Sequence, residues 1–133
     1  MSLPDPAKIR ILGPTAGQMT LQPLMDRLRS MMTDSVGVVR NAEGLVQAVR
    51  QSAAIEREAT GRSASVASAA LAARLIATAA YLRNESRGGH FRDDFPLSDA
   101  AQAKRSRITL EQADAFLAVL EGTESRQRMQ GRV

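Results

Sequence analysis

The chain has 133 residues, of which 44% are hydrophobic and 24% are charged, proportions typical of a single soluble globular domain. It contains no cysteine, which excludes disulfides and thiolate metal sites. Eighteen basic and 14 acidic residues give a formal net charge of +4. The cations are spread along the chain and few aromatic side chains accompany them, so we expect solvated basic surfaces and no nucleic-acid partner.

The sequence lacks the patterns of a secreted or membrane protein. Residues 1–6 have neither the basic nor the apolar region of a signal peptide. The longest apolar stretch, from Val66 to Leu82, is interrupted by Arg74 and is rich in alanine, so we expect it to be too short and too weakly hydrophobic to cross a bilayer. We therefore expect a cytoplasmic protein with no membrane partner.

The first predicted elements are an extended lead-in and an amphipathic helix. Residues 1–18 are rich in proline and glycine and show no apolar period, which indicates a linker. A helix is predicted over 20–34, with Thr20 as its N-cap and Pro23 in its first turn. Its apolar stripe consists of Leu21, Leu24, Met25, Leu28, Met31 and Met32. We expect the pair Val38–Val39 to anchor the turn that follows.

Two further helices are predicted over 41–60 and 64–86. Asn41 is the expected cap of the first, Gly61 ends it, and Ser63 or Ser65 starts the second. The expected buried face of helix 41–60 is Leu45, Ala48, Val49, Ser52, Ile55 and Ala59. The expected shared face of helix 64–86 is Val66, Ala69, Ala70, Ala73, Ile76, Ala77, Ala80 and Tyr81. Alanine favours the helix and lets neighbouring helices approach closely.

A shorter fourth helix is predicted from Leu110 to Leu120. Thr109 and Gln112 form a capping-box pattern, and Gly122 is the expected stop. Residues 123–133 are predicted to be a polar tail. The fold class is therefore all-α: an up-and-down bundle of three main helices, spectrin-repeat-like, plus a short fourth helix, within a domain of residues 19–122.

The segment RNESRGGHFRDDFP, residues 83–96, is dense in ionisable side chains and contains the only histidine. We expect Gly88 or Gly89 to close the third helix in the left-handed conformation, and Pro96 to prevent its restart. Phe91 and Phe95 are expected to anchor the segment. His90 with the following aspartates lacks the spacing of a strong metal site, and a general base needs a pocket that the segment does not supply. Ordering of the loop by its own ion pairs is the favoured interpretation.

This segment resembles the C-terminal signature of the flavoprotein family that contains succinate dehydrogenase, fumarate reductase and L-aspartate oxidase. The stretch SVGVVRNAEGL, from Ser35 to Leu45, resembles the family's turn between its first two C-terminal helices. The resemblance spans roughly Leu21 to Pro96. The dehydrogenase subunits continue into a longer extension that contains tryptophan, and this chain has no tryptophan. The resemblance therefore favours the L-aspartate oxidase branch.

The resemblance implies a role in an FAD enzyme that oxidises L-aspartate to iminoaspartate, on the quinolinate route to NAD. It implies that the chain corresponds to the detached C-terminal helical domain, with FAD bound by another domain of the parent. No G-x-G-x-x-G turn occurs in the chain, so we expect it to bind no cofactor and no metal and to carry no catalytic residue. The residues matching the signature are expected to form a contact with the FAD-binding domain of the same parent chain: Arg83, Glu85, Ser86, Arg87, His90, Arg92 and Asp94.

Other assignments remain open at this stage. The same domain of a succinate dehydrogenase or fumarate reductase flavoprotein subunit is one. A free-standing basic helical module that binds nucleic acid or an acidic protein is another. If one face of the bundle normally covers another domain, the chain alone exposes an apolar patch, and a homodimer through that face becomes possible.

Overall fold

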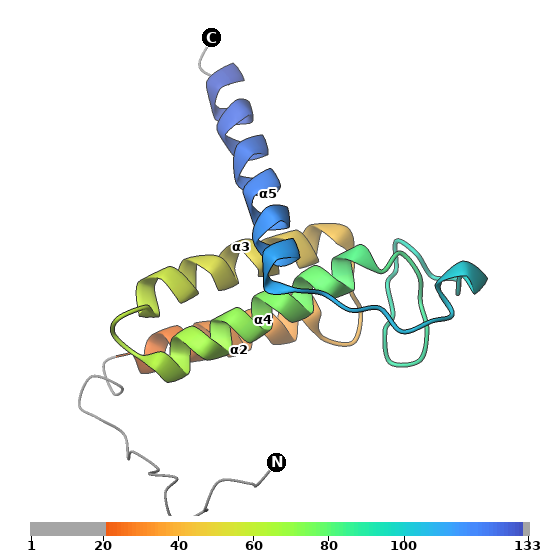
Figure 1. Cartoon of the computed structure of the whole chain (residues 1–133), viewed down its shortest axis with the longest axis horizontal. Helices are drawn as coiled ribbons and strands as arrows, with labels where there is room; N and C mark the ends of the chain where they lie inside the picture. Colours follow the sequence, from red (N-terminus) through yellow and green to blue (C-terminus); the bar gives the residue numbers. More distant parts are fainter. Residues whose placement is uncertain (1–20, 132–133) are drawn as a thin grey trace, which may run out of the picture.

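The computed structural model describes residues 21–131 (Figure 1). The predicted lead-in of residues 1–18 and the Thr20 cap lie outside this range. Four α-helices and one 3-10 turn occur, and no strand is formed within the described range. The elements are α2 (Gln22–Val36), α3 (Ala42–Ala59), α4 (Ala64–Leu82), η2 (Ala100–Gln102) and α5 (Leu110–Gln130).

Helices α2, α3 and α4 run alternately up and down and form a bundle, which confirms the predicted fold class (Figure 1). The most extensive contact is between α3 and α4. The predicted caps are present: Asn41 accepts a hydrogen bond from the Gly44 backbone N–H at 2.9 Å, and Ser63 accepts one from Val66 at 3.4 Å. These side chains satisfy backbone donors that the first turn of a helix leaves without partners.

The core lies along the predicted apolar faces. The expected face of α3 is entirely buried, and Leu24, Leu28 and Met31 bury the corresponding face of α2. Helix α4 contributes mainly small side chains, which lets its backbone lie close to α3. Its buried apolar residues are Val66, Ala70, Ala73, Ala77 and Ala80. Ile76, predicted to share this face, is exposed instead, because the buried stripe is occupied by alanine and by Thr78.

Helix α4 also corrects the expectation about membrane spanning. By length and composition alone, its 19 residues suffice to cross a bilayer. Its buried stripe against α2 and α3 is the packing of a core helix. Arg74 in its middle is buried as well, and binds Glu56 of α3 at 3.0 Å and Asp114 of α5 at 2.7 Å.

Helix α5 is longer than predicted. It begins with the expected capping box of Thr109 and Gln112, but it continues through Gly122 to Gln130, so the predicted stop at Gly122 is wrong. Residues 123–130, predicted as part of a polar tail, are helical. A glycine inside a helix costs only about 1 kcal/mol. Beyond the glycine, Glu124 binds Arg50 of α3 at 3.2 Å. The first half of α5 packs on the bundle through Phe116, Leu117 and Leu120, and the helix then projects away from it (Figure 1).

Candidate functional site

The signature residues form a loop at one end of the bundle, which we call the motif loop, residues 83–99. Helix α4 ends at Leu82, four residues before the predicted 86. Gly88 does adopt a left-handed conformation, with φ of +57°, but it does not close the helix. It forms the tip of a turn in which Arg87 and His90 exchange two backbone hydrogen bonds of 2.8 and 3.0 Å.

Arg92 is the central side chain of the motif loop and is only 1% exposed. Its Nη1 donates to the carbonyl of Tyr81 at 2.6 Å and to Asn84 Oδ1 at 3.0 Å. Its guanidinium also lies over the ring of Phe95, 4.7 Å from the centroid. The last carbonyls of a helix lack internal partners and carry partial negative charge. Arg92 therefore caps the C-terminal end of α4 from ten residues beyond it.

Asp94 neutralises Arg92 and reaches a second helix. Its two carboxylate oxygens accept from Nε and Nη2 of Arg92 at 2.9 and 2.6 Å. The same carboxylate accepts the backbone N–H of Ala42, the first residue of α3, at 3.0 Å. These contacts, that with Arg92 first, lower the pKa of Asp94 below its usual value. Asp94 is thus ionised and bound to the positive end of α3.

Glu85 forms the second ionic centre of the loop and is fully buried. Arg87 donates to it from Nε and Nη2 at 3.1 Å each, and Arg83 donates at 2.6 Å. The backbone N–H of Asp99 donates at 2.8 Å. The hydrogen bonds from Arg87 are the largest cause that lowers the pKa of Glu85, to about 2. This carboxylate therefore binds both ends of the motif loop together.

Ser86 connects the two ionic centres. Its hydroxyl accepts the backbone N–H of Arg92 at 2.9 Å and donates to the carbonyl of Phe95 at 2.8 Å. Its own N–H donates to the carbonyl of Leu97 at 3.1 Å. The serine thus fixes the backbone that carries Arg92.

His90 joins the motif loop to the turn between α2 and α3. Its Nδ1 lies 3.0 Å from Nη1 of Arg40, and its Nε2 lies 3.1 Å from the carbonyl of Arg83. A guanidinium can only donate, so Nδ1 accepts and Nε2 carries the proton. Both ring nitrogens are thereby engaged in hydrogen bonds within the domain. Within residues 21–131 no cluster of side chains suited to a metal ion occurs.

Several partners of the signature residues were not predicted from the sequence. Arg40 donates its backbone N–H to the Phe91 carbonyl, and its own carbonyl accepts from Asp93, so residues 40 and 91–93 lie side by side. Asp99 and Gln102 complete the Glu85 centre from the far side of the loop. The stretch 35–45 resembles a turn of the same family, and this resemblance is the only sequence signal for Arg40.

Apolar side chains surround the motif loop on its outer surface. Val38, predicted to anchor its turn, is 85% exposed, and Val39 is exposed too, because the adjacent backbone pairs with the motif loop and turns these side chains outward. Leu97 is 80% exposed, and Phe91 and Phe95 are partly exposed. The loop therefore buries its ionic centres and exposes several apolar side chains, next to polar ones such as Asp93 and Ser98.

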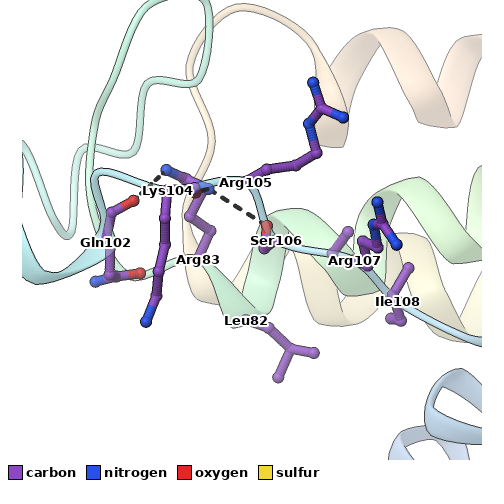
Figure 2. A pocket seen from close by; sticks show the side chains of 9 residues that line it. Leu82, Arg83, Gln102, Lys104, Arg105, Ser106, Arg107 and Ile108 are labelled. Carbon is purple, nitrogen blue, oxygen red and sulfur yellow. Dashed lines mark hydrogen bonds between the residues drawn. The ribbon is translucent and has the colours of Figure 1, made fainter.

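A pocket of about 260 Å³ lies beside the motif loop (Figure 2). The end of α4 forms one wall with Ala79, Leu82 and Arg83, and residues 102–108 form the other. Arg83 holds the two walls together by donating to the carbonyls of Gln102 and Lys104 at 2.7 and 3.3 Å.

Comparison with known proteins finds similarity to one flavoprotein family. Residues 60–124 match the family described as fumarate reductase flavoprotein C-term. The chain is 48% identical over 81 residues to an L-aspartate oxidase of Rhodospirillum rubrum, a match that covers 60% of this chain and 28% of that protein. L-aspartate oxidases of Mesorhizobium japonicum and Caulobacter vibrioides are 41% identical over 90 residues and 38% identical over 107 residues. Those two matches cover 68% and 74% of this chain, and 17% and 20% of the relatives. No solved structure gives a significant match.

The chain belongs to the C-terminal domain family of the fumarate reductase and succinate dehydrogenase flavoproteins. The three L-aspartate oxidases identify the branch of that family to which it is similar, as the resemblance of residues 83–96 indicated. The chain spans between about a sixth and somewhat over a quarter of the length of these relatives.

Proposed function

We propose that the chain is the C-terminal helical domain of an FAD-dependent L-aspartate oxidase, which packs on the FAD-binding domain of its parent and is not catalytic alone. The parent reaction in this proposal is oxidation of L-aspartate to iminoaspartate, for quinolinate and NAD biosynthesis in the cytoplasm. The observation that carries the proposal is the similarity to three L-aspartate oxidases, at 38% to 48% identity over 81 to 107 residues.

The chemistry of the motif loop supports a structural role for the signature residues. The carboxylates Glu85 and Asp94 are saturated by arginines and backbone N–H groups, and His90 uses both ring nitrogens. A catalytic acid or base needs a free position within hydrogen-bond reach of a substrate. These side chains instead hold the loop in one shape and leave its apolar exterior available for a neighbouring domain.

The described residues do not offer a fit for FAD. A dinucleotide cradle needs a strand followed by a glycine turn that opens a helix. Gly88–Gly89 follows a helix and leads into a loop, and no strand precedes it. FAD binding is therefore assigned in this proposal to the partner domain, and we derive no step of the oxidation from the residues of this chain.

The contact surface that the proposal assigns to the partner domain is the exterior of the motif loop. Val38, Val39 and Leu97 are its most exposed apolar members. Apolar surface of this kind gains stability when another domain removes it from water, at about 25 cal/mol per Å². A homodimer through the same surface remains the alternative occupant when the chain is alone.

A chimera tests the proposal directly. The matched region of the Mesorhizobium japonicum L-aspartate oxidase is replaced by this chain, and flavin content and hydrogen peroxide release with L-aspartate are measured. We expect FAD to be retained and aspartate to be oxidised, whereas deletion of the region abolishes flavin retention. The control is a chimera in which Val38 and Leu97 are both changed to Asp, which should weaken the domain contact.

Two results would contradict the proposal. One is a folded chimera that lacks FAD while the parent retains it. The other is the chain alone, purified without any partner, binding stoichiometric FAD and oxidising L-aspartate. Oxidation of succinate but not aspartate by a protein that contains this domain naturally would favour the dicarboxylate dehydrogenase branch instead.

A further inference from the structure

The segment between η2 and α5, residues 103–109, has a feature that the proposed function does not use. We call it the basic linker. It runs as an extended ribbon alongside the end of α4 and belongs to no helix (Figure 1). Lys104, Arg105 and Arg107 lie within it and are exposed. None of these three cations forms an ion pair in the part of the chain that the structure describes.

The backbone of the basic linker is also unpaired. Between Arg105 and Ile108, none of the backbone N–H or carbonyl groups has a backbone partner within residues 21–131. The segment is nevertheless held in place, because Arg83 donates to the Lys104 carbonyl and to the Ser106 hydroxyl, both at 3.3 Å. An extended segment that is already ordered and has free backbone groups is a template for pairing with another strand.

The pocket beside the basic linker gives this template an apolar component. Figure 2 shows Lys104 on the same side of the segment as Leu82, with Arg105 on the opposite side. Leu82, Ala79 and Ile108 line the pocket, whose volume of about 260 Å³ matches one or two apolar side chains. Side chains alternate between the two faces of a strand. A strand paired here therefore meets Arg105 on one face, and the pocket together with the Lys104 side chain on the other.

We propose that the basic linker binds an extended acidic segment of another polypeptide by strand addition, with acidic side chains opposite Arg105 and Arg107 and an apolar side chain in the pocket against Leu82. The unpaired cations supply charge complementarity, and the free backbone supplies the hydrogen bonds. Because Arg83 fixes the linker beforehand, little ordering entropy is lost on binding. The inference does not depend on the proposed function, since its residues are not part of the motif-loop exterior.

The probe is a short capped peptide of alternating Glu and Val, titrated into the ¹⁵N-labelled full chain. We expect saturable shifts of the backbone amide signals of residues 105–108. We also expect slower hydrogen exchange in the complex at alternate amides, those of Arg105 and Arg107, because a strand paired along one edge bonds every second residue. A Lys–Val peptide of the same length should not bind, since it repels the three cations.

Matched variants separate backbone pairing from charge. Arg107→Gln removes the charge and keeps the N–H, whereas Arg107→Pro removes both. If the backbone pairs, the proline variant should bind the Glu–Val peptide about fivefold or more weakly than the glutamine variant. A Glu–Val peptide N-methylated at alternate residues should show the same loss with the unaltered chain, which keeps the test valid if the proline variant misfolds.

Several results would overturn the proposal. Absence of saturable binding is one. Equal affinity of the N-methylated and unmodified peptides is a second, because it leaves charge alone as the cause. A third is binding of a single-stranded DNA oligonucleotide as tight as that of the peptide, with no difference between the glutamine and proline variants, since this indicates a general polyanion surface.

Discussion

Arg92 and Asp94 form a double ion pair, with N–O distances of 2.6 and 2.9 Å, that connects the C-terminal end of α4 to the N-terminal end of α3. The arginine donates to the last carbonyls of α4, and the aspartate accepts from the first N–H of α3. Each charge thus lies at the helix end of opposite partial charge. The pair therefore stabilises α3, α4 and the motif loop together.

Arg92→Ala should lower the free energy of unfolding by about 3 kcal/mol, because it leaves Asp94 and several carbonyls without their buried partner. Arg92→Lys should recover less than half of the loss, because the single ammonium group of lysine cannot make all the hydrogen bonds that the planar guanidinium makes. Urea denaturation measures both values. Arg29→Ala is the matched control: Arg29 pairs with Asp26 on the surface and is 69% exposed, so a change below about 0.5 kcal/mol is expected. Equal losses in Arg92→Ala and Arg29→Ala would contradict the assignment.

The stability of the fold should fall in acid over a range set by Glu85. Its pKa is lowered from 4.5 to about 2, chiefly by hydrogen bonds from Arg87. Above pH 4.5 the carboxylate is ionised in both the folded and the unfolded chain, and its contribution is fully present. Between about pH 4.5 and 2 the unfolded chain takes up the proton first, so the free energy of unfolding falls as the pH falls.

Glu85→Gln removes this part of the acid dependence. The free energy of unfolding, measured by urea at a series of pH values, should therefore differ most between the two proteins above pH 4.5, and the difference should shrink toward pH 2. The variant keeps a smaller slope, because the pKa of Asp94 is lowered as well. Parallel curves for the two proteins would show that Glu85 is not bound to arginine in solution.

The two glycines at the tip of the motif loop should respond differently to alanine. No atom lies within 4 Å of a Cβ added at either position, so space does not distinguish them. Gly88 has φ of +57°, a conformation that costs an alanine about 1 kcal/mol, whereas Gly89 does not have a positive φ. Gly88→Ala should thus destabilise by about 1 kcal/mol and Gly89→Ala by much less, as measured by thermal or urea unfolding. The reverse order would mean that the turn has another shape.

Arg74 should control the attachment of α5. It is the only side chain within residues 21–131 that bonds to carboxylates of both α3 and α5, through Glu56 and Asp114. Asp114→Asn should therefore accelerate hydrogen exchange in α5 while leaving α2 to α4 protected, because it removes the bond to α5 alone. Arg57→Gln serves as the control, since the Arg57–Glu121 pair lies on the surface. Unchanged exchange in α5 would show that its apolar contacts suffice.

Arg87 tests the proposed domain contact in a protein that contains the FAD-binding domain. Arg87 binds the buried Glu85 but is itself 40% exposed, so it can also face a neighbouring domain. Arg87→Ala should lower the melting temperature and flavin content while turnover per bound flavin changes little, and lysine should rescue poorly. Normal flavin content with a large loss of turnover per flavin would instead assign Arg87 to the chemistry.

Local features of the fold were predictable from the sequence, and features set by distant residues were not. The caps Asn41, Ser63 and Thr109 act on residues three positions away. Spacing therefore identified Asn41 and Thr109, and it left Ser63 and Ser65 as alternatives for α4. The end of α4 is capped by Arg92, which lies ten residues beyond it in the motif loop. The spacing of apolar residues carries no information about this contact, so it predicted an end at residue 86 where the helix ends at Leu82.

The same distinction applies to the buried charges and exposed apolar residues. Arg74 is buried because partners 18 and 40 residues away in the sequence converge on it, and no local pattern encodes that. Val38 and Val39 look like core residues, but their exposure follows from the pairing of Arg40 with the motif loop. For the site, the structure gathers the signature residues in one hydrogen-bonded loop, and their partners Arg40, Asp99 and Gln102 could be identified only from the folded structure.

The link between α3, α4 and the motif loop bears on how this domain can diverge in sequence. Arg40, Ala42, His90 and Asp94 come from two segments some fifty residues apart, and each depends on a group in the other. A substitution in one segment therefore changes which substitutions the other can tolerate. Such mutual dependence slows drift at both places even when neither touches a substrate. A charged, glycine-containing signature can in this way be conserved because it maintains the fold. Finding such a signature in a new sequence is therefore not by itself evidence of an active site.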